Sequence, residues 1–463
     1  MSEQTKLTTE ERLGFARSIA GLIAGAGGRA YFVGGFVRDR VMSIPETDSP
    51  DIDIEVHGLA PDALCAVLEP LTPLKKTGVS FGIYSVPGYA IDIAMPRTER
   101  ATGRGHRDFE TFVDPFLGPE KAAVRRDFTI NAMMEDVLTG EILDFFGGRR
   151  DIENKILRHV NDVSFPEDPL RVLRAAQFSA RLGFEVDEKT AALCAEIPLD
   201  SLSSERVEGE MKKALMMSSR PSVFFNFLGK IGQNGLWFPE VEALRGVPQN
   251  PAYHMEGDVW THTMMVLDAA AALREKAARP YPFMLSALCH DFGKAVTTFE
   301  KEGVIHSYGH ETAGVRIAEK FLSRLVGEKS VRSYVKNMVL THMKPNVLFF
   351  AGASVKSTNK MFDQSVEPGD LLLIAEADSR GIIKPDNYRD ARPFLEERLA
   401  IYKEYVSRRA VTGADLAAAG IEPGPGYSEL LAYSRKLLLA GIEFDSALKQ
   451  TLAYARKMKN NKG

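Results

Sequence analysis

Two aspartates lie one residue apart in a segment whose other residues are typical of a buried β-strand. In "DIDIEV", Asp51 and Asp53 alternate with Ile52 and Ile54, so a strand would present both carboxylates on one face and both isoleucines on the other. A buried carboxylate without a partner is strongly unfavourable, and we therefore expect either a solvated strand end or a bound cation. Paired carboxylates suit Mg²⁺, which takes oxygen ligands and commonly links carboxylates to the phosphates of a substrate. Two unrelated acids at a wet strand end are the alternative.

The neighbouring segments could bring phosphate-binding groups to the same place. In "RAYFVGGFVRDRV" a predicted strand ends at Gly34 and Gly35 and a helix follows, an arrangement in which bare backbone amides can approach a phosphate. Arg38 lies one turn into that helix. Asp92 alternates with isoleucines in "YAIDIAMP", so it is either a third carboxylate of the site or an acid on an edge strand.

Length and composition indicate a globular protein with more than one core. The chain has 463 residues, of which 44% are hydrophobic and 26% are charged, and such a length corresponds to about three domains. A net charge of −4 argues against a uniformly basic surface that coats nucleic acid. The stretch "RTERATGRGHR" nevertheless carries four arginines against one glutamate, and local clusters of this kind are sufficient for phosphate contacts.

Cysteine usage and hydropathy narrow the class of protein further. Cys65, Cys194 and Cys289 are far apart and form no CxxC pair, so we expect neither a disulfide framework nor a cysteine metal site. No apolar run approaches the length of a membrane span. The expectation is a soluble, cytoplasmic protein without a membrane partner.

The patterning along the chain predicts four zones. Residues 1–160 mix short β-branched runs with helix signals, whereas residues 161–245 show apolar residues at the three- and four-residue spacing of helices. A Pro-, Asn- and Gly-rich stretch, "GVPQNPAYHMEGD", is typical of a linker. We expect a second helical domain at 250–393 and a helical tail at 394–463.

The order of short motifs in the first half resembles the class II tRNA nucleotidyltransferases. This family comprises the CCA-adding enzymes and their bacterial poly(A) polymerase relatives, within the polymerase-β superfamily. The motifs are GG-x-V-R-D, D-x-D, "RRDFTINAM" (125–133), "DFFGGRRDIENKILRHV" (144–160), "EDPLRVLRAAQFSARLGF" (167–184) and "SSERVEGE" (203–210). The resemblance extends over residues 30 to 245 and implies an α+β fold, in which a polymerase-β-like nucleotidyltransferase head with a mixed sheet precedes an all-α neck.

The resemblance also implies which residues carry the chemistry of the head. Nucleotidyl transfer of this kind uses two metal ions, and the resemblance assigns them, as Mg²⁺, to Asp51 and Asp53. One metal activates the attacking 3′-hydroxyl, and the other holds the triphosphate and the leaving pyrophosphate. Asp92 is the candidate third catalytic carboxylate. The expected nucleotide-binding residues of the head are Gly34, Gly35, Arg38 and Arg126.

A helix predicted from "EDPLRVLRAAQ" could read the base of the nucleotide. Its Asp168, Arg171, Arg174 and Gln177 recur every three residues and so lie along one side. A carboxylate next to a guanidinium offers an acceptor beside donors, and cytosine and adenine both present an amino donor beside a ring-nitrogen acceptor. Uracil and guanine present the reverse order, so an Asp/Arg pair could select CTP and ATP without a nucleic-acid template. Gln177 stands where many relatives have an arginine and brings no charge to a triphosphate. The alternative is an amphipathic helix with a surface ion pair between Glu167 and Arg171.

The C-terminal half carries histidines and aspartates in the order H…HD…H…H…D, which resembles the HD-type metal-dependent phosphohydrolases, an all-α fold. The residues in this order are His262, His290, Asp291, His310, His342 and Asp378. Imidazole and carboxylate ligands suit a divalent metal such as Ni, Mn, Fe, Zn or Mg, and six ligands would allow two metals. Lys294, one turn after the adjacent pair, is a candidate phosphate contact. His254 and His306 are typical of structural histidines.

The combination of the two halves is similar to the bacterial multifunctional CCA proteins, in which the HD domain has phosphatase, 2′-nucleotidase and cyclic phosphodiesterase activity. The expected activity is template-independent addition of C and A to the 3′ end of tRNA from CTP and ATP, with no protein partner indicated. Alternatives within the family add only CC, only the terminal A, or a poly(A) tail. An HD hydrolase whose head only binds RNA, and a non-catalytic RNA-binding regulator, are alternatives of other classes.

Overall fold

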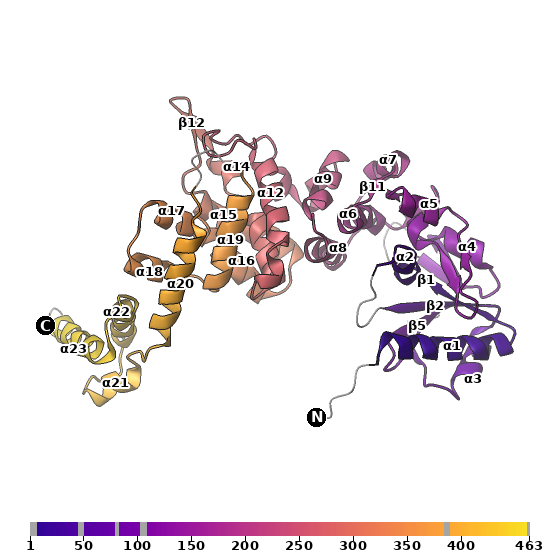
Figure 1. The fold of residues 1–463 in the computed structure, drawn as a ribbon, viewed down its shortest axis with the longest axis horizontal. Helices are drawn as coiled ribbons and strands as arrows, with labels where there is room; N and C mark the ends of the chain where they lie inside the picture. Colours follow the sequence, from indigo (N-terminus) through magenta and orange to yellow (C-terminus); the bar gives the residue numbers. More distant parts are fainter. Residues whose placement is uncertain (1–6, 45–50, 79–82, 102–108, 384–388, 461–463) are drawn as a thin grey trace. The chain divides into compact units, whose positions relative to one another are not determined.

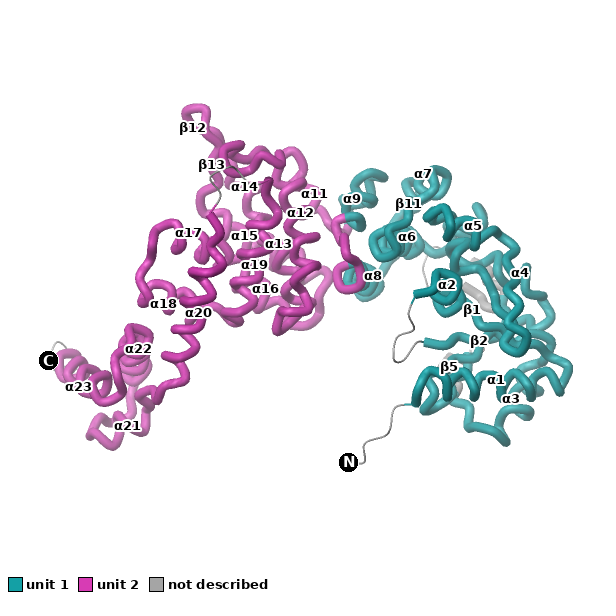
Figure 2. The backbone as a smooth tube through the Cα atoms, in the orientation of Figure 1, with its two compact units in different colours: residues 1–214, 223–236 teal, residues 215–222, 237–463 magenta. Residues whose placement is uncertain are grey.

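The computed structural model describes most of the chain and divides it into two compact units. The described residues are 7–44, 51–78, 83–101, 109–383 and 389–460. Unit 1 comprises residues 1–214 and 223–236, and unit 2 comprises residues 215–222 and 237–463 (Figure 2). Each unit contains one of the two residue clusters singled out from the sequence.

A seven-stranded sheet organises unit 1, with its strands in the order β3-β4-β5-β2-β1-β8-β9. The strands are β1 (Arg29–Val33), β2 (Ile52–His57), β3 (Lys75–Gly78), β4 (Ile83–Val86), β5 (Ile91–Ala94), β8 (Met134–Asp136) and β9 (Ile142–Leu143). Strands β2 and β5 pair in parallel, whereas the other neighbours in this sheet pair antiparallel. The mixed sheet predicted for the head is therefore confirmed.

The apolar face of this sheet forms one core with α1 (Thr9–Gly25) and α3 (Pro61–Leu68), two helices that lie next to each other in Figure 1. Five strand residues of this core are at most 1% exposed, namely Ile52, Ile54, Val56, Ile91 and Ile93. A fully buried isoleucine stabilises a fold by about 1.5–3 kcal/mol. The alternation that buries these side chains therefore also directs the aspartates between them to the opposite face of the sheet.

Local backbone chemistry determines where the first helices begin. α1 begins after Thr8, whose hydroxyl accepts a hydrogen bond from the Glu11 backbone N–H (3.2 Å). The Glu11 carboxylate accepts one in return from the Thr8 N–H (2.8 Å), which completes a capping box. α2 (Gly35–Val41) begins after Gly34, whose φ of +71° is a conformation that favours glycine.

Two of the motifs recognised in the sequence pack against each other in unit 1. The helix α5 (Gly148–Glu153) is capped by Asp144, whose carboxylate accepts from the backbone N–H of Gly148 at 2.7 Å. Buried Asp151, on α5, accepts a hydrogen bond from the Thr129 hydroxyl at 2.7 Å. The "DFFGGRRD" and "RRDFTINAM" segments are therefore joined by a buried hydrogen bond.

The rest of the described chain is mainly helical, in agreement with the predicted neck and HD domain. The helices are α4 (Pro119–Val124), α6 (Leu170–Leu182), α7 (Glu188–Glu196), α8 (Ser204–Met217), α9 (Ser222–Lys230), α10 (Asn234–Trp237), α11 (Pro239–Glu242), α12 (Val259–Ala271), α13 (Pro280–Cys289), α14 (Lys294–Thr297), α15 (His310–Leu325), α16 (Lys329–Thr341), α17 (Lys344–Phe350), α18 (Val355–Gln364), α19 (Pro368–Arg380), α20 (Arg392–Ser407), α21 (Gly413–Ala418), α22 (Tyr427–Leu439) and α23 (Phe444–Asn460). Two short strand pairs interrupt them: β10 (Ile156–Leu157) with β11 (Glu185–Val186), and β12 (Phe299–Lys301) with β13 (Val304–His306).

The arginine-rich stretch of the head lies only partly within the described residues. β6 (Arg97–Ala101) pairs antiparallel with β7 (Phe109–Val113), and residues 102–108 between them lie outside the described part. Among the described residues, no helix combines the length and the apolar character that crossing a membrane requires.

The close approach of α5 to Thr129 can be tested with two glycine substitutions. A Cβ at Gly148 would lie 2.5 Å from the carbonyl oxygen of Thr129 and 2.9 Å from the side chain of Met133. Gly148→Ala should therefore destabilise unit 1 by about 1–3 kcal/mol through overpacking. Gly209→Ala, on α8 with nothing within 4 Å of the new Cβ, should instead stabilise by about 0.5–1 kcal/mol. Calorimetric unfolding of the full chain measures both, and a shift of the same sign for the two variants would contradict this packing.

Candidate active sites

Parallel pairing of β2 with β5 brings the aspartates of unit 1 to one face of the sheet. Asp53 and Asp92 are register partners in this ladder, and Asp51 immediately precedes β2. Asp92 accepts a hydrogen bond from the Ser85 hydroxyl at 2.6 Å. Asp53 reaches solvent, yet partial desolvation by the surrounding protein, together with the charges of Asp92 and Asp51, raises its pKa. A cation between these carboxylates would relieve that repulsion.

The glycine turn between β1 and α2 lies beside these carboxylates. A Cβ built on Gly34 would be 3.6 Å from the guanidinium of Arg126 and 3.9 Å from the carboxylate of Asp53. A Cβ on Gly35 would be 3.4 Å from the guanidinium of Arg38. The structure therefore brings the turn, one carboxylate and two arginines together, and a side chain at either glycine would narrow the space between them.

The sequence reasoning missed Glu55, which pairs with Arg126, one of the arginines predicted to bind nucleotide. Glu55 is 1% exposed, and its carboxylate lies 3.1 Å from Arg126 and 3.4 Å from Arg125. His57 Nε2 lies 3.1 Å from the other carboxylate oxygen. Burial alone would raise the pKa of Glu55, but His57 and the two arginines lower it to about 2. The alternation of β2 was a usable signal, because Glu55 and His57 follow Asp53 on the same face.

A second buried chain of polar contacts runs from α2 to α6. Arg38 donates to the Asn131 side-chain oxygen (2.8 Å), Asn131 donates to Asp127 (3.1 Å), and Arg174 Nε donates to Asp127 (2.7 Å). The guanidinium groups of Arg38 and Arg174 lie 5.1 and 5.2 Å from the ring centroid of Phe178. Asp127 and Asn131 belong to the "RRDFTINAM" motif, but only the folded chain reveals that they connect two arginines predicted to bind nucleotide.

The proposed base-reading residues are arranged differently from the expected side of a helix. α6 begins at Leu170, so Asp168 lies before it in an extended conformation (φ −117°, ψ 102°). The expectation that Asp168 is part of the helix is wrong, because Pro169 disfavours helical geometry for the residue before it. Asp168 pairs with Arg206 at 2.8 Å, rather than with Arg171.

Two residues of α6 are less exposed than their role in base recognition would suggest. Arg171 is 8% exposed and donates to the carbonyl oxygens of Ser164 and Arg125. Gln177 is 1% exposed, and its amide nitrogen has no hydrogen-bond partner among the described residues. Arg171 is thus a buried anchor of the neck on the head segment, not a solvated surface charge.

In unit 2 the fold gathers four imidazoles and two carboxylates from five elements. They are His262 on α12, His290 and Asp291 after α13, His310 at the start of α15, His342 after α16, and Asp378 on α19. All except Asp378 are nearly fully buried. The two imidazole pairs His262/His290 and His310/His342 have Nε2–Nε2 distances of 3.4 and 3.3 Å.

The other ring nitrogens of these histidines are held by acceptors on the protein. The Nδ1 contacts are to the carbonyl oxygens of Ala287 (His290, 2.8 Å), Ser307 (His310, 2.9 Å) and Val339 (His342, 2.7 Å), and, for His262, to Glu256 (3.1 Å) and Gly381 (3.3 Å). For His290, His310 and His342 the carbonyl acceptor fixes the tautomer in which Nδ1 carries the proton and Nε2 keeps its lone pair. His262 takes the same form once its second proton is lost. The four Nε2 atoms therefore converge as a set of metal ligands would.

Asp291 lies at the centre of the cluster. Its Oδ1 is 3.3 Å from His310 Nε2, and its Oδ2 is 3.2 Å from His290 Nε2 and 2.7 Å from Lys294 Nζ. Oδ1 is buried and accepts no hydrogen bond from any of the described residues. Asp291 belongs to both groups that could hold a metal ion around it, one with His262 and His290 and one with His310 and His342. One carboxylate shared between two triads suits a bridged pair of cations.

The protonation of the cluster differs from one histidine to the next. Burial opposes the charged form of His262, but hydrogen bonds to Asp378 and Glu256 raise its pKa to about 9. Burial and the neighbouring His290 lower the pKa of His342 to about 3, which leaves it neutral. A metal cation would displace the proton from His262, since an imidazole ligates in its neutral form.

Two residues of the predicted linker belong to this site and were missed by the sequence reasoning. Glu256, 1% exposed at its side chain, lies 3.1 Å from His262 and 2.7 Å from His254. Gln249 is buried and accepts a hydrogen bond from Lys294 Nζ at 2.8 Å. Their spacing carries no recognisable pattern, because only the packing of this segment against α12 and α14 places them here.

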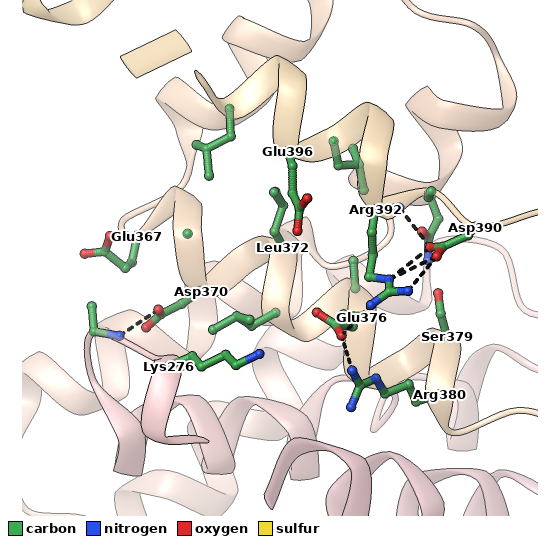
Figure 3. Close-up of a pocket in the computed structure, with 18 of the residues that line it drawn as sticks. Lys276, Glu367, Asp370, Leu372, Glu376, Ser379, Arg380, Asp390, Arg392 and Glu396 are labelled. Atoms are coloured by element: carbon green, nitrogen blue, oxygen red, sulfur yellow. Dashed lines mark hydrogen bonds and ion pairs between the residues drawn. The ribbon is translucent and has the colours of Figure 1, made fainter. Parts of the chain in front are cut away.

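A separate cavity of about 450 Å³ lies between α19 and α20 and is lined by paired charges. Figure 3 shows Arg380 against Glu376 and Arg392 against Asp390, with Asp370 accepting from the backbone at 2.8 Å. A second cavity lies beside the histidine cluster, and its lining includes Asp291, His310, His342 and Asp378. None of the described residues that line the first cavity also lines this second one. α19 therefore contributes Asp378 to the second cavity and a different set of residues to the first cavity, where Arg380 and Arg392 pair with Glu376 and Asp390.

The Asp127–Arg174 pair predicts a pH dependence of the stability of unit 1. Burial alone would raise the pKa of Asp127, but the charge of Arg174 and the bond from Asn131 lower it. Its stabilising contribution is therefore complete above its ordinary pKa near 3.8 and is lost as pH falls through the lowered folded value. Asp127→Asn should destabilise unit 1 by about 1.5–3 kcal/mol at pH 7 and weaken this acid dependence. Calorimetry between pH 7 and pH 3 measures the loss of stability and its pH dependence, with exposed Asp200→Asn as control. If Asp127→Asn lost stability on acidification as steeply as the unchanged chain, the role given to Asp127 would be contradicted.

Comparison with known proteins places the chain in a family. The description "Poly A polymerase head domain" matches residues 30–158, and "HD domain" matches residues 259–379. A multifunctional CCA protein of Actinobacillus pleuropneumoniae serotype 5b (strain L20) is 35% identical over 370 residues, or 77% of this chain and 86% of the relative. That of Xanthomonas campestris pv. campestris (strain B100) is 34% identical over 425 residues, or 89% of this chain and 98% of the relative.

Solved structures share the fold at lower identity. A Bacillus stearothermophilus CCA-adding enzyme in complex with CTP is 22% identical with a TM-score of 0.68, over 97% of this chain and 99% of that one. A Thermotoga maritima CCA-adding enzyme complexed with tRNA is 18% identical with a TM-score of 0.62, over the same shares of the two chains. The resemblance inferred from the motifs is thus confirmed: this chain belongs to the family of the multifunctional CCA proteins, with a poly(A) polymerase-type head and an HD domain.

Proposed function

We propose that this chain is a tRNA nucleotidyltransferase that adds C and A to the 3′ end of tRNA from CTP and ATP without a template. The observation that carries the proposal is the face formed by Asp51, Asp53 and Asp92 beside the turn at Gly34 and the guanidinium of Arg126. Acids aligned by strand pairing next to bare amides and an arginine suit a metal-bound nucleoside triphosphate. The relatives named as multifunctional CCA proteins support it.

In the proposed site Asp51 and Asp53 would hold Mg²⁺, which would neutralise charge on the triphosphate and lower the pKa of the attacking 3′-hydroxyl. Gly34 and Gly35 leave room for the phosphates of the nucleotide. Arg126 neutralises the charge of these phosphates, and Glu55 holds the Arg126 guanidinium in position. These groups are oriented before substrate binds, so little reorganisation is needed at the moment of transfer.

Base selection is proposed for Asp168 and Arg174, while Arg171 anchors α6 through its bonds to the carbonyl oxygens of Ser164 and Arg125. The Asp168 carboxylate is about one-third exposed and can accept a hydrogen bond from the amino group that cytosine and adenine share. Arg206 orients this carboxylate, and Arg174, fixed by Asp127, presents its guanidinium next to Phe178. Gln177, whose buried amide nitrogen has no hydrogen-bond partner among the described residues, would contribute a hydrogen-bond donor rather than a charge.

For unit 2 we propose a divalent metal site, with Ni, Mn, Fe, Zn and Mg as candidates, that hydrolyses 2′-nucleotides, 2′,3′-cyclic nucleotides and other phosphate esters. Its ligands are His262, His290, Asp291, His310, His342 and Asp378, and Lys294 contacts the phosphate. The convergence of four Nε2 atoms on Asp291 favours this second activity. Both activities are placed in the cytoplasm, where tRNA and nucleotides are available.

Purified chain incubated with tRNAs that end at the discriminator base, at C or at CC tests the first activity. We expect CTP alone to extend the first two substrates and ATP alone to extend the third. Asp53→Asn should abolish both additions, because it removes one ligand charge from the shared metal site, while exposed Asp200→Asn should leave them unchanged. Repeated ATP addition to any end would indicate a poly(A) polymerase, and absence of addition would indicate a head that only binds RNA.

Gly293 provides a test of the second activity that leaves every proposed ligand intact. A Cβ here would lie 1.9 Å from the backbone oxygen of His310 and 2.8 Å from the nitrogen of Gly314, so Gly293→Ala must push α15 away from Asp291. We expect loss of bound transition metal, measured by elemental analysis, and at least a hundredfold lower hydrolysis of 2′,3′-cyclic AMP, on the order of a mispositioned catalytic group. Gly327→Ala, with nothing within 4 Å, is the matched control, and tRNA extension should survive in both variants. Full hydrolysis by Gly293→Ala would exclude the cluster as the active site.

A further inference from the structure

The cavity that contains the histidine cluster also contains aromatic side chains that no proposed role explains. It measures about 710 Å³. The proposed ligands and phosphate contact among its lining residues are Asp291, Lys294, His310, His342 and Asp378. The other aromatic residues in the same lining are Tyr253, His254, His306 and Tyr308, of which His254 pairs with Glu256.

The side chain of Tyr308 is part of a stack, although it remains largely in solvent. Its ring stacks on His306, with centroids 4.9 Å apart and planes 20° from parallel. Phe299 lies behind both, at 5.7 Å from His306 and 6.0 Å from Tyr308. Tyr308 is nevertheless 71% exposed, and Tyr253 is 68% exposed. One face of the Tyr308 ring is therefore covered by protein, and much of the side chain is left available to a second aromatic group.

A tight hairpin holds this stack in a fixed position. The strands β12 and β13 pair antiparallel, with Phe299 opposite His306. Between the strands, Glu302 and Gly303 have φ values of +52° and +75°, the combination that a two-residue type I′ turn requires. The hairpin projects beyond the helices of unit 2 in Figure 1. Such a turn matches the twist of its strands, so the rings are positioned before any ligand binds.

The same segment connects the stack to the proposed metal site. Ser307 joins the hairpin base through a hydrogen bond between its hydroxyl and that of Thr298 (2.8 Å). The carbonyl oxygen of Ser307 accepts the Nδ1 proton of His310 (2.9 Å). Tyr308 thus lies between a residue anchored in the hairpin and a proposed ligand two positions later, so its position relative to the cluster is fixed by the backbone.

We propose that Tyr308, backed by His306 and Phe299, is a stacking platform for the base of a nucleotide whose phosphoester lies at the histidine cluster. The proposal rests on the phosphohydrolase function proposed for unit 2 and assigns the residue that contacts the base of its nucleotide substrates. A nucleotide combines a phosphate, which Lys294 and the ligand cluster can hold, with an aromatic base, which an exposed tyrosine face can hold. Tyr253 lines the same cavity and is the second candidate contact. Because every base presents a π-face, this platform favours nucleotides over base-free esters without selecting one base.

The kinetic test compares a substrate that has a base with one that lacks it. Hydrolysis of 2′-AMP and of glycerol 2-phosphate is measured with the full chain, with Tyr308→Ala and with Tyr308→Phe. Tyr308→Ala should raise KM for 2′-AMP about tenfold, the loss typical of one stacked base, and leave kcat/KM for glycerol 2-phosphate within about twofold. Tyr308→Phe should retain the wild-type KM, because the ring is kept. Phe116→Ala, equally exposed at 71% in unit 1, is the matched control.

A binding measurement separates failure of the platform from failure of the hydrolase. The fluorescence of 2-aminopurine riboside 2′-monophosphate is quenched on stacking, so we expect the full chain to quench it more than Tyr308→Ala does. If wild type hydrolyses neither ester with any of the candidate metals, the hydrolase proposal fails, and the quenching difference alone decides the platform. Equal quenching by wild type and Tyr308→Ala, or an equal change of kcat/KM for both esters in Tyr308→Ala, would overturn it. RNA ending in a 2′,3′-cyclic phosphate, assayed beside 2′,3′-cyclic AMP, shows whether the base belongs to an RNA end or to a free nucleotide.

Discussion

Carboxylates and imidazole lone pairs repel one another, so a protein can hold several of them at one point only if a rigid backbone fixes their positions. In unit 2 this constraint is met at Asp291, whose carboxylate contacts His290, His310 and Lys294 within 3.3 Å. Each imidazole is held by an acceptor on its Nδ1 side, so none can rotate its Nε2 away from the cluster. The close approach of Gly293 to the backbone of α15 also keeps the cluster together, because any side chain at Gly293 would separate Asp291 from His310.

Unit 1 meets the same constraint with a different backbone. Its carboxylates are aligned by a parallel strand pair, which places Asp53 and Asp92 in register. The cost of that alignment appears as the raised pKa of Asp53. Arg126 approaches from the neighbouring loop and is itself held by buried Glu55. A bound cation would relieve the repulsion between the carboxylates. An anionic substrate would in turn compensate the positive charge of Arg126, which Glu55 compensates only in part.

The connection between head and neck has a physical consequence for substrate recognition. Arg38 of the head and Arg174 of the neck contact the same ring, Phe178, and are joined through Asn131 and Asp127. A displacement of α6 would therefore alter both guanidinium groups. Within unit 1 the part expected to bind phosphate and the part expected to read the base are therefore packed together. One arrangement of the two arginines can then serve phosphate binding and base recognition at once.

The sequence alone was sufficient for properties that depend on local spacing. The alternation around Asp51 and Asp53, the glycine turn and the helical second half follow from residues near one another in the chain, since side-chain direction repeats every two or 3.6 residues. The mixed sheet and the HD fold were predicted instead from the order of motifs and its resemblance to known families, because the histidine motif extends from His262 to Asp378. Proline chemistry is equally local, yet its effect at Pro169 was overlooked, and Asp168 was assigned to a helix that begins after it.

The tertiary structure decided which distant residues share a site. Glu55 on Arg126, Glu256 on His262 and the stacked face of Tyr308 beside the ligand cluster depend on contacts between segments that no spacing rule connects. Such contacts are set by the packing of whole elements, whose positions result from the burial of all their apolar side chains together. A local pattern can therefore nominate a ligand, but only the fold determines what holds that ligand in place and what lies next to it.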